Sequence, residues 1–234
     1  IEGPCVTIRK FPKEKLTRRH LLANGTVNEE ALLFLEEVVD KKFNIFISGG
    51  TSSGKTTLLN VLSDAIDERE RIITIEDSAE LKIKEGQNLI RLEARNTKDQ
   101  FNNNVTIRDL IKSALRMRPD RIIVGEVRGE ETIDMLQGMN TGHDGSISTG
   151  HSNTTKDMLF RLETMVMTGM EIPLKAIRQQ IASALDIMVH IQKISNRGRR
   201  IVEISEVVDM EGDRIHIEPV YIYDEKEDQL VSTG

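Results

Sequence analysis

Short apolar runs recur through the middle of the chain, and helical periodicity separates most of them. Apolar runs over residues 43–48, 71–77 and 121–126 predict buried strands, and a further strand is expected near 146–149. Segments in which apolar positions recur every three or four residues predict helices between these strands. Strands that alternate with helices over 43–150 predict an α/β fold with a mostly parallel sheet covered on both faces.

The two ends of the chain depart from this alternation. Residues 1–25 are interpreted as the end of an N-terminal domain plus a linker, 26–224 as one domain and 225–234 as a flexible tail. After residue 154, helical patterns followed by strand patterns predict a helical and β extension. Because the chain begins with Ile1 rather than Met, we expect it to be a piece of a longer protein.

The pattern is less regular between the second and third strands. Apolar positions over 81–92 predict a small hairpin with its turn near 85–88, and 94–105 is expected to be a polar loop. Residues 106–109, Thr-Ile-Arg-Asp, resemble a capping box with Asp in place of Glu. A helix is therefore expected to begin there.

The clearest chemical motif lies directly after the first strand. Residues 49–56 read Gly-Gly-Thr-Ser-Ser-Gly-Lys-Thr and match the phosphate-loop pattern G-x-x-x-x-G-K-[ST]. Glycines let backbone N–H groups turn inward around phosphates, and the positive end of the next helix points at them. Lys55 is expected to reach the β- and γ-phosphates and Thr56 to ligate Mg²⁺. A Gly/Ser loop that binds nothing is the alternative. The predicted nucleotide contacts are Gly49, Gly50, Thr51, Ser52, Ser53, Gly54, Lys55, Thr56 and Thr57.

Acidic residues end the strands that neighbour this loop. Glu126 ends an apolar strand, where a carboxylate reaches Mg²⁺ directly or through water, and Glu76 ends another, where it could activate water. Asp77 is open between a metal ligand and a structural residue. Either glutamate could instead cap a helix at the surface. Because ligands bind at the carboxyl ends of parallel strands, the loop and the acids are expected to converge at one edge.

Two histidines flank the strand expected near 146–149. His143 and His151 stand eight residues apart, and a zinc pair is disfavoured because Cys5 is distant and no tight ligand spacing occurs. A role in sensing the γ-phosphate or orienting water is favoured, with His151 the stronger candidate. An arginine could also act in trans as a finger, although most exposed arginines are ordinary surface charge. The arginine candidates are Arg91, Arg95, Arg116, Arg118 and Arg128.

Composition narrows the class of function. The net charge is −6, the pI is about 5.5, and aromatic residues make up 3% with no Trp. An acidic chain with few aromatics disfavours a protein that binds nucleic acid by stacking bases. The single Cys5 fits a reducing compartment. No uninterrupted apolar run approaches the roughly 18 residues of a membrane span, so membrane contact is expected through a partner.

Four motifs in order resemble those of the secretion-superfamily ATPases, which power type II secretion, type IV pili, type IV secretion and archaeal surface filaments. These motifs are the phosphate loop and the segments 74–81, 115–129 and 139–146. The similarity covers roughly residues 3–218 and is nearest to the CpaF ATPases of Tad pili. It implies a RecA-like P-loop NTPase core joined to an N-terminal domain. It also implies a hexamer with ATP and Mg²⁺ at the domain and subunit junctions.

The resemblance also implies roles for matching residues. Glu76 takes the water-activating position of the aspartate box, Glu126 lies in the second nucleotide motif, and His151 ends the histidine box. Arg9 matches the family's interdomain strand and is expected to touch nucleotide. Ser52 stands where the family usually has Gly, and it is tolerated if the local backbone is not left-handed.

Three functions stay open at this point. The first is a cytoplasmic motor at the inner face of the membrane, which hydrolyses ATP and drives platform proteins of a pilus or secretion system. The second is a DNA-directed RecA-like ATPase, which the acidic pI disfavours. The third is a nucleotide-gated assembly module without turnover. Glu76 and Glu126 favour catalysis.

Overall fold

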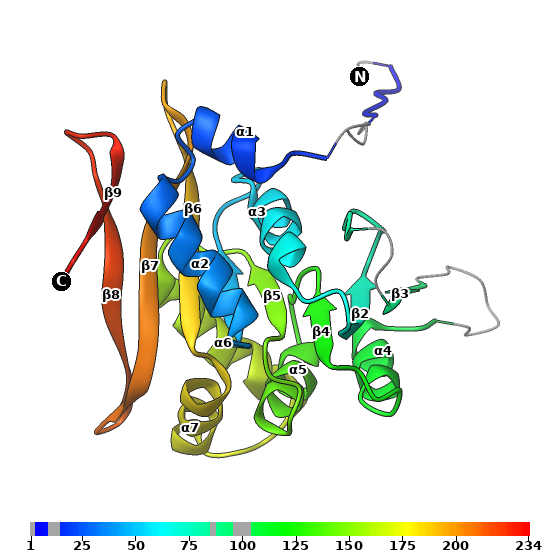
Figure 1. The fold of residues 1–234 in the computed structure, drawn as a ribbon. Coiled ribbons are helices and arrows are strands. Elements are labelled where there is room, and N and C mark those ends of the chain that lie inside the picture. Colours follow the sequence, from blue (N-terminus) through cyan, green and yellow to red (C-terminus); the bar gives the residue numbers. More distant parts are fainter. Residues whose placement is uncertain (1–2, 9–14, 85–87, 96–103) are drawn as a thin grey trace.

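The computed structural model describes residues 3–8, 15–84, 88–95 and 104–234 (Figure 1). The described residues form a nine-stranded sheet in the order β3-β2-β4-β5-β1-β6-β7-β8-β9. The part from β3 to β6 is parallel, and β7 to β9 continue it antiparallel. The predicted α/β class and mostly parallel sheet are confirmed. The strands are β1 (Ile45–Ser48), β2 (Arg71–Glu76), β3 (Asn88–Glu93), β4 (Arg121–Val124), β5 (Ile147–Gly150), β6 (Ile187–Ile194), β7 (Gly198–Glu211), β8 (Arg214–Asp224) and β9 (Gln229–Ser232).

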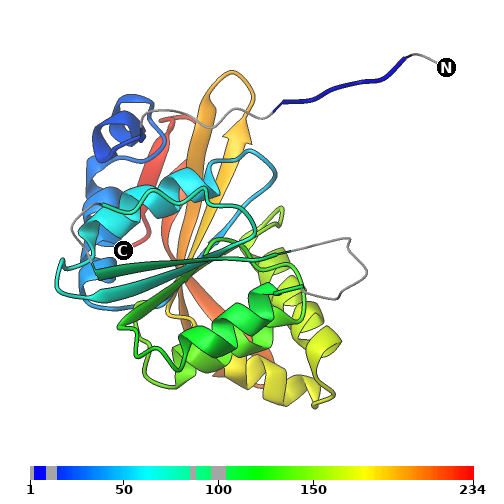
Figure 2. The same cartoon turned by 90° about the vertical axis from the view of Figure 1, so that its right-hand side faces the viewer.

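Helices cover both faces of this sheet, as the edge-on view in Figure 2 shows. Side chains alternate between the faces, so that Ile45 and Ile47 of β1 join one apolar cluster and Phe46 joins the other. The first cluster packs beneath α2 and α3, and the second beneath α4 to α7. The helices are α1 (Arg18–Ala23), α2 (Glu29–Asp40), α3 (Lys55–Leu62), α4 (Ile107–Ala114), α5 (Glu131–Asn140), α6 (Thr155–Gly169) and α7 (Leu174–Ala184), with a 3₁₀ turn at Ser63–Ala65.

The hairpin predicted over 81–92 is wrong. Strand β3 pairs in parallel with β2, with Asn88 opposite Arg71 and Glu93 opposite Glu76. Leu81 and Ile83 are buried in the first cluster but belong to no strand. Alternating apolar residues mark a half-buried segment without stating the direction of its partner, and here the chain crosses back before β3 begins. The capping box at 106–109 does start α4.

Segments near both ends of the chain pack on the sheet domain. Leu21 of α1, in the stretch interpreted as linker, is buried in the first cluster, and so is Leu230 of β9 in the predicted tail. Asp228 accepts two hydrogen bonds from the guanidinium of Arg200, each 2.9 Å long. Among the described helices, none is long and apolar enough to cross a membrane.

Candidate active site

The phosphate loop wraps tightly between the end of β1 and the start of α3. A side chain at Gly49 would place its Cβ 2.2 Å from the carbonyl oxygen of Ile191, so only glycine fits there. Gly54, the residue that precedes α3, has a φ of 106°, which glycine adopts without strain. Thr56 and Thr57 lie half-buried in the first turn of α3.

Ser52 does not meet the condition under which serine was expected to replace glycine. Its φ is 59°, in the left-handed region that side chains with a Cβ adopt at a cost. Nε of Arg199, on the β6–β7 hairpin, donates a hydrogen bond of 3.2 Å to the Ser52 carbonyl. The stem of Arg199 also packs on Gly54, since a Cβ at Gly54 would lie 3.1 Å from Arg199 Cδ. The hairpin thus holds the loop from outside.

Lys55 is buried at the mouth of this loop. Its Nζ donates hydrogen bonds of 3.0 Å to the carbonyl oxygens of Gly49 and Gly50. Nδ1 of His151 lies 3.2 Å from the same nitrogen. Burial lowers the pKa of Lys55, and the nearby Glu126 carboxylate opposes this effect. The ammonium is therefore held by neutral carbonyls, which anionic phosphate oxygens would replace with stronger, charge-assisted bonds.

Glu126 sits at the centre of a charged array beyond Lys55. Its carboxylate accepts hydrogen bonds of 3.0 and 3.1 Å from Nε and Nη2 of Arg128. Nε2 of His151 lies 3.0 Å from Glu126 Oε1, and Arg128 Nη1 also donates to Asp77 Oδ2 at 3.1 Å. Burial lowers the pKa of His151, and Lys55 lowers it further, so the imidazole stays neutral at neutral pH.

Glu76 lies apart from this array and is 6% exposed. Its Oε1 accepts hydrogen bonds of 2.9 Å from the backbone N–H groups of Glu80 and Leu81. A Cβ at Gly125 would come 3.0 Å from Glu76 Cγ, so the glycine leaves room for this side chain. Burial raises the pKa of Glu76, against the effect of the two N–H donors. The carboxylate is thereby fixed in orientation and made more basic.

The model of the family described as Type II/IV secretion system protein matches residues 1–231. The chain belongs to this family. The Conjugal transfer protein TrbB of Rhizobium radiobacter is 35% identical over 92% of this chain and 62% of its own length. The chain spans less than two thirds of the length of several curated relatives that it matches.

Two solved structures share the fold. The VirB11 ATPase of the Brucella suis type IV secretion system, in complex with sulphate, superposes with a TM-score of 0.69 at 33% identity, over 83% of this chain and 57% of that chain. The pilus retraction motor PilT with bound ADP gives 0.62 at 26% identity, over 87% of this chain and 56% of that one. The RecA-like core expected from the resemblance is therefore supported.

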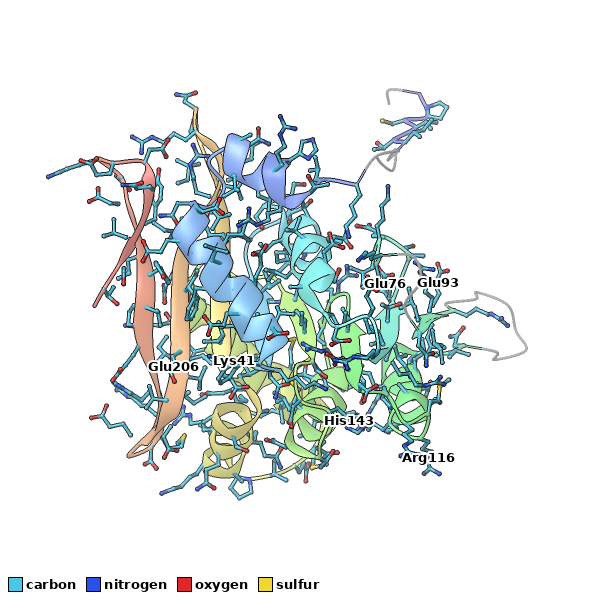
Figure 3. All side chains as sticks on the ribbon, in the orientation of Figure 1. Lys41, Glu76, Glu93, Arg116, His143 and Glu206 are labelled. Atoms are coloured by element: carbon cyan, nitrogen blue, oxygen red, sulfur yellow. The ribbon has the colours of Figure 1, made fainter. Side chains whose placement is uncertain are left out.

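Several candidates of this family member lie away from the array. His143 precedes β5 and Arg116 follows α4, at the end of the strands opposite to Glu76 (Figure 3), and Arg118 precedes β4 at that same end. Arg91 lies on β3, and Arg95 bridges to Val105 after that strand ends. Arg9 lies outside the described residues. Of the arginines considered, Arg128 is the one that contacts Glu126.

No cluster of three or more His, Cys, Asp or Glu residues that could hold a metal occurs in the described part of the chain. Mg²⁺ takes one or two carboxylates together with substrate phosphates, so such a site is completed by the nucleotide itself. Ser53 Oγ is buried and, within the described residues, has no hydrogen-bond partner. A loop with an unused hydroxyl and an ammonium held by carbonyls fits a phosphate ligand.

Arg199 is the residue at this site that sequence reasoning missed. It is separated from the phosphate loop by most of the domain, and its contact with Ser52 depends on β6 pairing next to β1. Neither motif nor periodicity indicates which strand follows β1 in the sheet. The basic stretch 197–200 was the only available signal, and it is equally typical of exposed surface.

Proposed function

We propose that this chain is the ATP-hydrolysing core of a motor that powers type IV secretion, conjugal transfer or pilus assembly. The observation that carries the proposal is the contact array in which Lys55 meets His151, His151 meets Glu126, and Glu126 meets Arg128 at the phosphate loop. Family membership supports the same reading. A loop that served only as structure would have no use for this array.

Binding would rest on the loop and on α3. Backbone N–H groups of 49–57 and the N-terminal end of α3 would hold the phosphates, with Lys55 transferring its bonds from carbonyls to phosphate oxygens. Thr56, Glu126 and Asp77 would hold Mg²⁺, which neutralises phosphate charge when bound. Ser53 Oγ would supply a further donor.

Three residues would take different roles in hydrolysis, according to their charge states. Glu76, with its raised pKa and fixed carboxylate, would take the proton of the attacking water. Neutral His151 would sense the γ-phosphate, since it already contacts both Lys55 and Glu126. Arg128 would move from Glu126 and Asp77 toward the charge that develops on the phosphoryl group.

The wider setting of the chain is part of this proposal. The full protein would form a homo-hexamer, with ATP between subunits and with a second domain at the N-terminal side to which Arg9 belongs. It would act at the cytoplasmic face of the inner membrane on platform proteins, without nucleic acid as a partner. Assignment to the CpaF branch of Tad pili stays a prediction.

The test is ATP hydrolysis measured as a function of protein concentration. Wild type is compared with Lys55→Ala and Glu76→Gln, and Lys41→Ala serves as a control because Lys41 forms only an exposed pair with Glu37. We expect turnover that rises more steeply than protein concentration, is lost in the two site variants and is kept in the control. Tight ATP binding without turnover at any concentration would overturn the motor and favour a nucleotide-gated assembly module.

A further inference from the structure

A network of polar residues next to the phosphate loop runs from the buried His190 to the exposed Asn153, and the proposed chemistry does not use it. His190 of β6 is 1% exposed. Its Nδ1 lies 2.7 Å from Ser48 Oγ at the end of β1, and its Nε2 lies 3.0 Å from Nε2 of Gln192. The same Gln192 nitrogen donates a hydrogen bond of 3.0 Å to the carbonyl oxygen of Asn153. Three segments distant in sequence thus meet through two side chains.

The amide of Gln192 sets the hydrogen-bond directions in this network. Its NH₂ group has two donors, of which one faces the Asn153 carbonyl and the other faces His190 Nε2. When the second amide N–H is used in this way, Nε2 accepts, and the proton of the neutral imidazole is on Nδ1, where it points to Ser48 Oγ. Ser48 in turn donates to the Val189 carbonyl at 3.4 Å.

Both ends of this hydrogen-bonded network adjoin site residues. Ser48 immediately precedes Gly49, whose carbonyl oxygen accepts from Lys55 Nζ at 3.0 Å and from the N–H of Ser152 at 3.4 Å. Asn153 lies two residues after His151 in the loop that follows β5. The distance between Lys55 and His151 therefore depends on how the β1 loop and the β5 loop are held relative to each other.

We propose that His190 and Gln192 are positioning residues that lock the loop carrying His151 to the phosphate loop, so that Lys55 and His151 are presented to the same phosphate. The inference rests on the proposed nucleotide site and adds two residues from outside its motifs. Neither residue touches substrate. They act through Ser48 and Asn153.

The lock is intact only while His190 is neutral. A proton on Nε2 would face the amide N–H of Gln192 and compete with it for the Asn153 carbonyl, and turning the amide would set its oxygen against that same carbonyl. Burial lowers the pKa of His190. The backbone of Asn153, Glu203 on β7 and Asp157 on α6 favour the charged ring, whereas Lys55 of α3 opposes it. Since the pKa lies below its ordinary value, the lock holds at neutral pH and opens as the pH falls through that value.

The direct test is nuclear magnetic resonance of the imidazole nitrogens in ¹⁵N-histidine-labelled protein. The signal of His190 is assigned by its loss in His190→Asn. At pH 7 we expect a neutral ring protonated on Nδ1, and we expect Gln192→Leu to shift the signals of His151. The exposed Gln137→Leu is the matched control and should leave them unchanged. A ring protonated on Nε2, or an unmoved His151 in Gln192→Leu, would overturn the inference.

The second test measures affinity for a fluorescent ATP analogue with Mg²⁺ in Ser48→Ala, Gln192→Leu and the double variant. Each single substitution should weaken binding about fivefold to tenfold. The double variant should bind no more weakly than the weaker single variant, because both substitutions interrupt the same hydrogen-bonded network. Fully additive losses would contradict a shared lock. If wild type binds no nucleotide, the proposed function fails, while the tautomer of His190 and the response of His151 still decide this inference.

Discussion

Glu76 carries its charge where little water reaches it. A buried carboxylate that still accepts two backbone N–H bonds has two opposed influences on its pKa, and here burial prevails. The folded protein therefore holds a proton on Glu76 more tightly than the unfolded chain does. It follows that the contribution of Glu76 to stability is most favourable below its ordinary pKa of 4.5 and falls as the pH rises through the higher folded-state value.

The variant Glu76→Gln tests the effect of this buried carboxylate on stability and its effect on catalysis. The amide oxygen can accept the same two N–H bonds without a buried charge, so we expect a higher melting temperature than wild type at pH 7 to 8. The difference should shrink as the pH falls toward 4.5. ATP hydrolysis should fall about 100-fold or more, because a general base is removed. Thermal melts across pH and a turnover assay check both, and a variant less stable than wild type at pH 8 would refute the account.

Sequence reasoning identified residues whose position follows from a motif or a strand end. Lys55 lies at a defined place in the phosphate loop, and Glu126 lies two residues after β4 ends, so both could be expected near the carboxyl ends of the strands. The backbone conformation of Ser52 could not be, since left-handed φ values of a serine leave no trace in composition. Nor could His190 be singled out, because its partners come from strands that become neighbours only in the folded sheet.

The β6–β7 hairpin is the element that joins the antiparallel extension to the phosphate loop. Ile191 approaches Gly49 through its backbone, and Arg199 reaches the Ser52 carbonyl from the paired strand. Backbone contact of this kind fixes the loop independently of side-chain chemistry. The extension therefore supports the nucleotide site in addition to adding core.

Arg199→Ala should weaken nucleotide binding without unfolding the protein. The change removes one hydrogen bond to the loop and the packing on Gly54, so we expect a loss of roughly threefold to tenfold in affinity for ATP. Lys193→Ala, an exposed cation opposite Arg199 in the same hairpin, is the control. Titration with a fluorescent ATP analogue measures both. Equal affinity in the two variants would show that the contacts of Arg199 with Ser52 and Gly54 are dispensable for nucleotide binding.

Periodicity predicted the strands that are buried on both faces of the sheet better than the strands at its edges. The strands β1, β2 and β4 are continuous apolar runs, which is typical of parallel strands buried on both faces. The stretch 81–92 shows the limit, because a half-buried edge strand reads the same in a hairpin and in a parallel pair. Strand β9 follows a run of charges and is held by pairing with β8, which its own residues do not announce.

At the scale of the whole molecule, a buried ion pair joins the strands at the end of the sheet opposite to the site. Arg121, at the start of β4, is fully buried and donates hydrogen bonds of 2.7 and 2.9 Å to the carboxylate of Glu70. It also donates to the carbonyl of Gly145 at 3.3 Å, in the turn before β5. The pair thus joins the approaches to β2, β4 and β5.

Arg121→Met should lower the free energy of unfolding by about 3–5 kcal/mol, because it leaves the Glu70 carboxylate buried without its main partner. The double variant Arg121→Met with Glu70→Gln should recover part of the loss, since the unpaired charge is then gone. Urea denaturation measures both. Arg69→Ala, which removes an exposed pair with Asp67, should change stability little. A single variant as stable as wild type would show that the pair is not needed.

The strand order also governs when the protein can first become functional during its synthesis. Strand β1 lies between β5 and β6, each of which is translated roughly 100 residues or more after it. A ribosome adding about 5–20 residues per second would complete these neighbours roughly 5–30 s after β1 emerges. Until then β1 has no neighbours on either side, and the loop that follows it has no Ile191 backbone or Arg199 against which to close. A nascent chain released before residue 199 would carry the whole phosphate-loop motif and still lack the framework that shapes it.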